Sequence, residues 1–407
     1  MFRPYVQAAR TPGALLPLVA SFIGGGLPIG MLTLAVLLLI RLQSGSFLGA
    51  GLMAAALSIG NAVGVAVQGV LIDRRGQTVV LIPASLICLS SLVGLVFAVG
   101  YGAPPALTAG LAVAGGAAIP ATPSSMRALW PALVPDSQLR PTAYALSAVS
   151  FTAATVLGPV LVSGLLVLGG PRVAVLAAAG LAGGGGLLFA ATPASRHWVP
   201  VRATPVPRRP RRWPGRGMRT LAVGNLAIGL AAGLSGVAVP ATAISLGAAA
   251  LAGVFGAASA AGDLCGGLAY GSRRWRLPLA TRLVAAQSGS AVMGICLILA
   301  SRSLPAMTLA VTVSGAAGAV QGITTTTLLD DVADPGSLTG SYALLVSCGL
   351  AGSAIGYAVG GILVSAAGIA NTFLVAAAAG AAAAAWYARR SRTLRPRPQV
   401  RCPDARS

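Results

Sequence analysis

The sequence predicts an all-α membrane protein in which twelve transmembrane helices form two pseudo-symmetric six-helix bundles. Two observations lead to this prediction. Apolar residues make up 56% of the 407 positions and charged residues only 9%, whereas about 25% of the residues of a soluble domain are charged. The chain also contains an internal repeat, because GVLIDRRGQTVVL at 69–81 returns as GLAYGSRRWRLPL at 267–279, 198 residues later.

Other positions repeat at the same separation. It pairs Asp136 with Asp334, and it also pairs Gly158 with Gly356. Chance matches would not keep one separation, so we interpret the chain as one unit used twice. Parallel repeats of this kind are a common architecture of secondary transporters.

Each predicted span is a stretch of about 20 mostly apolar residues, which is the length that crosses a bilayer as a helix. In the first half, charged residues, prolines and glycines delimit spans at 13–40, 47–70, 79–99, 104–126, 142–168 and 172–192. In the second half, the spans are 219–242, 247–270, 280–300, 304–328, 339–367 and 370–388. The predicted domains are therefore a first half at 1–192, an Arg/Pro-rich linker at 193–218, a second half at 219–388 and an Arg-rich tail at 389–407.

The arginines predict the orientation in the membrane. If the N-terminus is cytosolic, 25 of the 28 basic residues fall in cytosolic segments, and only Arg41, Arg172 and Arg302 fall outside. The positive-inside rule therefore predicts a multi-pass protein of the plasma membrane with both termini in the cytosol. We expect the linker and the tail to lie against anionic lipid headgroups rather than to bind nucleic acid.

The loop between the second and third spans carries a motif of the form G-x-L-x-D-R-x-G, made by Gly69, Leu71, Asp73, Arg74 and Gly76. Together with the repeated halves, it resembles the signature loop of the major facilitator superfamily, and the chain is similar to the twelve-helix bacterial drug and metabolite exporters of that superfamily. Gln77 and Thr78 replace the basic pair that usually ends the motif. The resemblance covers essentially the whole chain.

The resemblance implies that this loop is a conformational latch between the halves. Glycine at Gly69 and Gly76 lets backbones approach closely or turn. Asp73 would face the N-terminus of the eleventh span, near residues 337–341, where a helix favours negative charge. The second copy of the loop has Gly271 in place of the aspartate, so we expect its latch to be weaker.

Asp263 is the only acidic residue clearly inside a predicted span. Two interpretations are open. The carboxylate could pair with Arg273 or Arg274 as a substitute latch, or it could carry a proton during transport, as intramembrane carboxylates commonly do.

A second resemblance lies on the fifth and eleventh spans. Gly158, Pro159, Gly352, Gly356, Gly360 and Gly361 are spaced as in the G-xxx-G-P-xx-G-G motif of the superfamily's exporters. Neither copy is complete, since Val162 and Ser163 replace the glycine pair and Tyr357 replaces the proline. The pattern favours export, and the alternative is that these residues only allow helices to kink and to pack closely.

In this superfamily the substrate lies between the halves, lined by the first, fourth, seventh and tenth spans. The candidates on those spans are Gly24, Gly25, Gly26, Pro28, Pro120, Pro123, Asn225, Gln321 and Thr324. The glycine run either exposes backbone carbonyls to a cavity or packs against other helices. No central position is charged, so we expect a neutral or amphipathic substrate. We expect Arg127, at the inner end of the fourth span, to be too shallow to reach it.

The sequence therefore predicts a secondary-active transporter that moves a small organic molecule by alternating access, as an exporter. An importer or facilitated-diffusion carrier is the alternative within this class, and a non-transporting sensor or scaffold is the alternative outside it. The sequence has no cluster of His, Cys or acidic residues at membrane depth and no nucleotide-binding loop. We expect no enzymatic activity, metal or other cofactor. Protons are the candidate coupling ion, and we expect a monomer.

Overall fold

The structure is a computed structural model that describes residues 11–134, 136, 138–198, 215–273, 275–333 and 338–394. Within this part of the chain the first half consists of α2 (Leu15–Ser21), the π-helical turn η1 (Phe22–Gly26), α3 (Leu27–Ser44), α4 (Phe47–Arg75), α5 (Gln77–Gly100), α6 (Pro105–Ala117), α7 (Thr122–Leu133), α8 (Arg140–Ala191) and α9 (Pro193–Arg196). The second half consists of α10 (Arg216–Ser245), η2 (Ala249–Leu251), α11 (Ala252–Ser272), α12 (Leu279–Ala300), α13 (Leu304–Val332), α14 (Leu338–Ala366), α15 (Ile369–Arg390) and η3 (Ser391–Leu394).

Eleven helical stretches of the described residues are long and apolar enough to cross a membrane. The longest, Arg140–Ala191, is 52 residues and contains two predicted spans, because Gly170 with φ 78° interrupts the helical backbone. Only glycine adopts such a φ without steric cost. Counted as two spans, this stretch brings the total to the predicted twelve. The fold is that of a multi-pass membrane protein.

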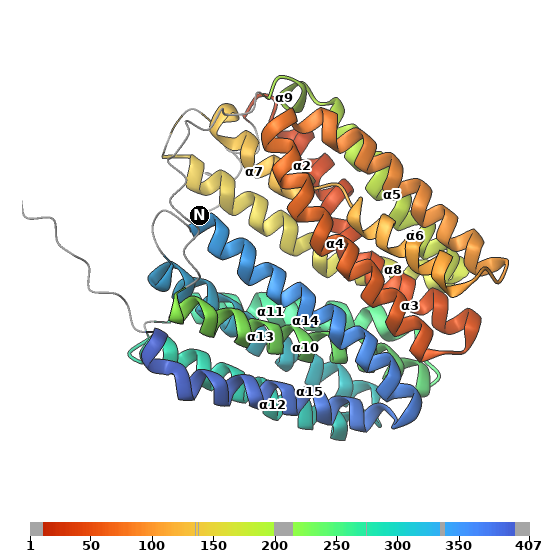
Figure 1. Cartoon of the computed structure of the whole chain (residues 1–407), viewed down its shortest axis with the longest axis vertical. Coiled ribbons are helices and arrows are strands. Elements are labelled where there is room, and N and C mark those ends of the chain that lie inside the picture. The colour runs from red at the N-terminus through yellow and green to blue at the C-terminus, as the bar shows by residue number, and fades with distance from the viewer. Residues whose placement is uncertain are drawn as a thin grey trace, which may run out of the picture.

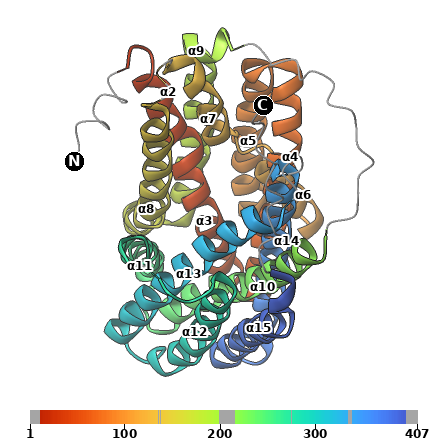
Figure 2. The same cartoon turned by 90° about the vertical axis from the view of Figure 1, so that its left-hand side faces the viewer.

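The two halves of the chain lie side by side as separate groups of helices. Figure 1 shows the helices from α2 to α9, coloured red to yellow-green, above those from α10 to α15, coloured green to blue. The view in Figure 2 shows the same separation.

Several helix ends differ from the predicted boundaries. The fourth span extends to Leu133 rather than ending at 126, and α10 begins at Arg216 rather than at 219. The predicted linker contains the short helix α9, and the predicted tail contains η3. The predicted spans end where Pro and Arg interrupt the apolar residues, but both residues are tolerated in a helix end that leaves the bilayer. The segments 199–214 and 395–407 lie outside the described residues.

The fourth span is discontinuous, because Ala118–Ala121 separates α6 from α7. The buried Gln68 of α4 bonds the backbone groups that this break leaves free. Its Nε2 donates to the carbonyls of Ala117 and Ile119 at 2.9 and 2.8 Å, and its Oε1 accepts from the amide of Ala121 at 3.0 Å. A broken helix at membrane depth needs such partners, because no water is available there.

The most extensive contacts between the halves are at two helix pairs. At the first pair, α4 meets α14: Gly51 and Gly361 approach so closely that a Cβ on either would overlap the backbone of the other helix, and the amide of Leu48 donates to Ser365 Oγ at 3.1 Å. At the second pair, α8 meets α11, where a Cβ on Gly253 would overlap the carbonyl oxygen of Pro159.

Both contacts lie at the same end of the molecule. Gly51 is near the start of α4 and Gly253 near the start of α11, whereas Arg74, Arg75 and Arg273 lie at or just beyond the other ends of these helices. We call the end with the contacts the closed end, and the other the arginine-rich end. The halves are therefore held together at the end away from the predicted cytosolic loops.

Candidate substrate pathway

A central cavity of about 620 Å³ is lined by both halves. The first half contributes Ile29, Gly30, Thr33 and Leu34 of α3 and Pro159 of α8. The second half contributes the remainder from α10 to α15. Among the lining residues, the polar side chains are Thr33, Ser235, Ser259, Asp263, Gln287, Ser290, Ser314, Gln321 and Tyr357. The cavity is thus apolar in the main and has a small set of polar groups, as is typical of a small-molecule site.

Asp263 lines this cavity. Ser259, one turn earlier on α11, lines it as well, since residues four apart share a helix face. The carboxylate therefore faces the space between the halves and does not pair with Arg273, whose guanidinium lies over the ring of Trp275 at 5.5 Å. The expected substitute latch with Arg273 is not formed in this structure, and Arg274 lies outside the described residues.

Gln287 supplies a second polar feature of the cavity, one that the sequence did not single out. Its side chain is 2% exposed, and its Nε2 lies 3.4 Å from the carbonyl of Gly380. Its Oε1 is buried and has no hydrogen-bond partner among the described residues. A buried acceptor without a partner costs free energy, so this oxygen is an unsatisfied polar group beside the cavity.

The candidate cavity residues separate into three groups. Gln321 lines the central cavity. Gly26 and Pro123 line a second pocket in the first half. The others line neither space and make contacts within one half or are buried: Gly24, Gly25, Pro28, Pro120, Asn225 and Thr324.

The glycine run packs against neighbouring helices. A Cβ on Gly24 would overlap the backbone at Gly185 and Gly186 of α8, and a Cβ on Gly25 would overlap Pro123. These glycines lie in the π-helical turn η1, which is a distortion often found at functional sites. Of the two interpretations of the run, close packing describes Gly24 and Gly25, whereas Gly26 lines a pocket.

Asn225 and Thr324 form hydrogen bonds within the second half. Asn225 Nδ2 donates to the carbonyl of Leu345 at 2.7 Å, which joins α10 to α14. Thr324 Oγ1 donates to the carbonyl of Val320 one turn earlier. Both side chains satisfy the backbone of the bundle and do not line the cavity.

The glycines of the fifth and eleventh spans also make close helix contacts. Gly158 packs on Gly30 of α3, and Gly352 and Gly356 pack on the backbone of α10. Gly360 contacts Val237 of α10, and Gly361 contacts α4 of the other half. Pro159 directs its carbonyl at Gly253 and lines the cavity. The contacts agree with the close-packing alternative, and they do not decide the direction of transport.

The loop motif lies at the arginine-rich end. Asp73, Arg74 and Arg75 are exposed at the end of α4, and Gly76 turns the chain with φ 93°. A Cβ on Gly69 would meet no atom within 4 Å, so this glycine makes no close backbone contact in this conformation. Its expected close approach is absent here.

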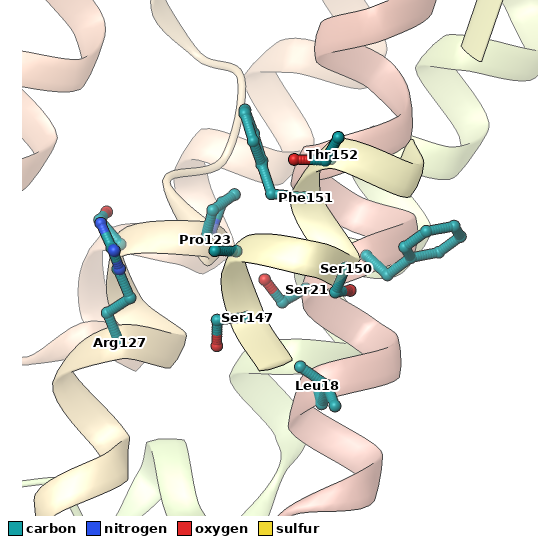
Figure 3. A pocket seen from close by; sticks show the side chains of 12 residues that line it. Leu18, Ser21, Pro123, Arg127, Ser147, Ser150, Phe151 and Thr152 are labelled. Carbon is teal, nitrogen blue, oxygen red and sulfur yellow. The ribbon is translucent and has the colours of Figure 1, made fainter. Parts of the chain in front are cut away.

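The second pocket, of about 340 Å³, lies within the first half and contains Arg127. Figure 3 shows that its side chains come from three elements: Leu18 and Ser21 from α2, Pro123 and Arg127 from α7, and Ser147, Ser150, Phe151 and Thr152 from α8. Arg127 lines this pocket and not the central cavity, so the expectation that it is too shallow for a central ligand stays a prediction.

Comparisons with known proteins support the fold. No family model and no curated protein matches the sequence. The structure is similar to the nucleoside transporter NupG (TM-score 0.69, 14% identity, 93% of this chain and 99% of that chain). It is also similar to a bacterial homolog of the human lysosomal transporter Spinster in an inward-facing, unoccupied conformation (0.70, 16%, 96% and 98%) and to the inward-open xylose transporter XylE from E. coli (0.70, 14%, 95% and 98%). The chain therefore has the fold of these transporters.

Proposed function

We propose that this protein is a secondary-active transporter that moves a small neutral or amphipathic organic molecule across the plasma membrane by alternating access, as an exporter. The observation that carries the proposal is the central cavity, which both halves line. Its volume falls in the range of about 300–1,000 Å³ that is usual for small-molecule sites. Similar structures are those of nucleoside and xylose transporters, which supports a small organic solute.

Alternating access is supported by the one-sided contact between the halves. Gly51 with Gly361 and Gly253 with Pro159 join them at the closed end, and Asp73 at the arginine-rich end is exposed. Two of the similar structures are described as inward-facing or inward open. If the arginine-rich end is cytosolic, the present conformation also opens inward, and the opposite state requires the loop motif to approach the second half.

The proposed orientation has both termini in the cytosol and the protein as a monomer, with halves at 1–192 and 219–388. Reporter fusions test this directly. A fusion after Ser303, between α12 and α13, is expected to report the outer side, and a fusion after Ser391 is expected to report the cytosol. The same signal from both fusions would contradict the orientation.

Asp73→Asn and Gly69→Leu are expected to slow transport while the protein remains folded in the membrane. In the state that is closed on the cytosolic side, the Asp73→Asn variant would lack a charge–dipole interaction. Such an interaction is worth up to about 2 kcal/mol when partly buried, which changes an equilibrium constant about thirtyfold. Leucine at position 69 has free space in the present conformation, so its effect arises only in the other state. The measurement is turnover by purified variants in proteoliposomes, with Gly271→Leu, also unobstructed here, as the control. Normal turnover by both variants would refute the latch.

The experiment that tests the function itself is solute flux into proteoliposomes. The solutes are a panel of small aromatic compounds that includes 2-naphthalenesulfonate and its neutral analogue 2-naphthalenesulfonamide. We expect saturable flux of at least one compound, above that of protein-free liposomes. Specific binding without flux would instead favour a non-transporting sensor. Saturable flux that is faster into the cell than out of it would favour an importer.

A further inference from the structure

The pocket around Arg127 has the composition of an anion site. Five hydroxyl side chains line it together with the guanidinium: Ser21, Ser124, Ser147, Ser150 and Thr152. No acidic residue lines it. Leu18, Phe22 and Phe151 form its apolar walls.

Arg127 lies in the middle of α7. The helix continues for six residues to Leu133, which at 1.5 Å per residue corresponds to about 9 Å of helix. The guanidinium is exposed to the pocket and has no hydrogen-bonding or ionic partner within the described part of the chain.

The hydroxyl groups differ in what they can offer. Ser147 Oγ accepts a hydrogen bond from the buried Trp130 Nε1 at 2.7 Å, so its own proton remains available to the pocket. Ser124 Oγ donates to the carbonyl of Ala121 at 2.9 Å and therefore has only lone pairs left. Ser150 and Thr152 make no hydrogen bond through their hydroxyls within the described residues, and both can donate.

A guanidinium and several hydroxyl donors that line the same pocket suit an oxyanion. Arginine binds carboxylate, sulfonate or phosphate oxygens through paired N–H groups, and such charge-assisted bonds are about twice as strong as neutral ones. A neutral ligand would leave the guanidinium desolvated without compensation. The site therefore selects for a negative charge.

The pocket and the central cavity follow one another along the same two helical spans. On the first span, Gly26 lines the pocket and Gly30 lines the cavity, and on α8 Thr152 lines the pocket and Pro159 the cavity. Four and seven residues of helix correspond to about 6 and 10 Å. Between these points the two spans pack against each other, since a Cβ on Gly26 would overlap Ala154, so the pocket is a separate site beside the central cavity.

We infer that the transported molecule is an amphipathic organic anion whose acidic group binds Arg127 and whose apolar body lies against Leu18, Phe22 and Phe151. This inference rests on the proposed function and narrows its substrate class. It gives Arg127 the role of a specificity-determining residue. The hydroxyls of Ser147, Ser150 and Thr152 orient the oxyanion.

The test compares 2-naphthalenesulfonate with 2-naphthalenesulfonamide, which has nearly the same shape but is neutral. Binding to the purified full-length protein is measured by calorimetry in detergent. We expect the wild type to bind the sulfonate about tenfold or more tightly than the sulfonamide, since a hydrogen bond to a charged group contributes about 1.5–3 kcal/mol. Arg127→Gln is expected to abolish the preference, Arg127→Lys to keep part of it, and Ser150→Ala to reduce it about threefold.

Arg75→Gln is the matched control, because Arg75 is an exposed arginine at the same end that lines neither space. It is expected to keep the preference. Equal affinity of the wild type for both compounds, failure to bind the sulfonate, or a preference that survives Arg127→Gln would each overturn the inference. If only the proposed function fails, binding would still depend on Arg127, but no compound of the panel would cross the membrane of the proteoliposomes.

Discussion

Asp263→Asn is expected to uncouple transport from a proton gradient. Asp263 lines the central cavity, and it does not pair with Arg273. A carboxylate that faces a cavity at membrane depth can change its charge during the cycle, whereas an asparagine cannot. We therefore propose the proton-carrying interpretation of this residue in place of the substitute latch.

The measurement is uptake by proteoliposomes with and without an imposed proton gradient. The wild type is expected to accumulate substrate against its gradient, and Asp263→Asn is expected only to equilibrate it. Asp136→Asn, which removes an exposed loop carboxylate, is the control and should behave as the wild type. If Asp263→Asn still accumulates substrate when the gradient is imposed, Asp263 is not the coupling acid.

Gly253→Leu and Gly51→Val are expected to reduce transport by about tenfold or more, because each substitution separates the halves at the closed end. A Cβ on Gly253 would overlap the carbonyl oxygen of Pro159, and a Cβ on Gly51 would overlap that of Tyr357. Backbone atoms cannot move aside as a side chain can, and forcing extra atoms into a packed interface typically costs about 1–3 kcal/mol. At the middle of that range, the population of the closed conformation falls by more than about tenfold.

A matched glycine in open space separates this effect from a general cost of the substitution. Gly180 lies within α8, and a Cβ there would meet no atom within 4 Å. Gly180→Leu is therefore expected to transport normally. Folding of all three variants is checked by size-exclusion chromatography. Full activity of Gly253→Leu and Gly51→Val would show that transport does not require the contact at the closed end.

The sequence predicted the fold because each helix is a separate apolar stretch of membrane length, and because the repeat at 198 residues joined the stretches into two sets. Helix ends were harder to predict. The end of the fourth span was set at 126 because Arg127 follows, but the helix continues to Leu133. One arginine is tolerated inside a span when it faces a pocket, and composition alone does not show which face that is.

The candidate site was predicted less well, for the same physical reason. Periodicity gives the residues that share a face of one helix but not the neighbour of that face. Gly24 and Asn225 were candidates because they lie on the first and seventh spans, yet they pack on other helices. Gln68 shows a further limit, because its three hydrogen bonds to the broken fourth span join residues about 50 positions apart in the sequence.

The measurement that most directly tests the account is a pair of distances, one at each end of the molecule. Spin labels are attached to cysteines in a background without the native cysteines, at Arg196 and Arg276 for the arginine-rich end and at Tyr101 and Ala367 for the closed end, all of which are exposed. Distances are measured by electron paramagnetic resonance in lipid nanodiscs, with and without a transported compound.

Alternating access predicts reciprocal changes. When the transported compound is added, a population should appear in which the Arg196–Arg276 distance is shorter and the Tyr101–Ala367 distance is longer than in the present conformation. In Gly253→Leu this population should already dominate without the compound. If both distances keep one value in all conditions, or if they lengthen together, the halves do not alternate about the central cavity.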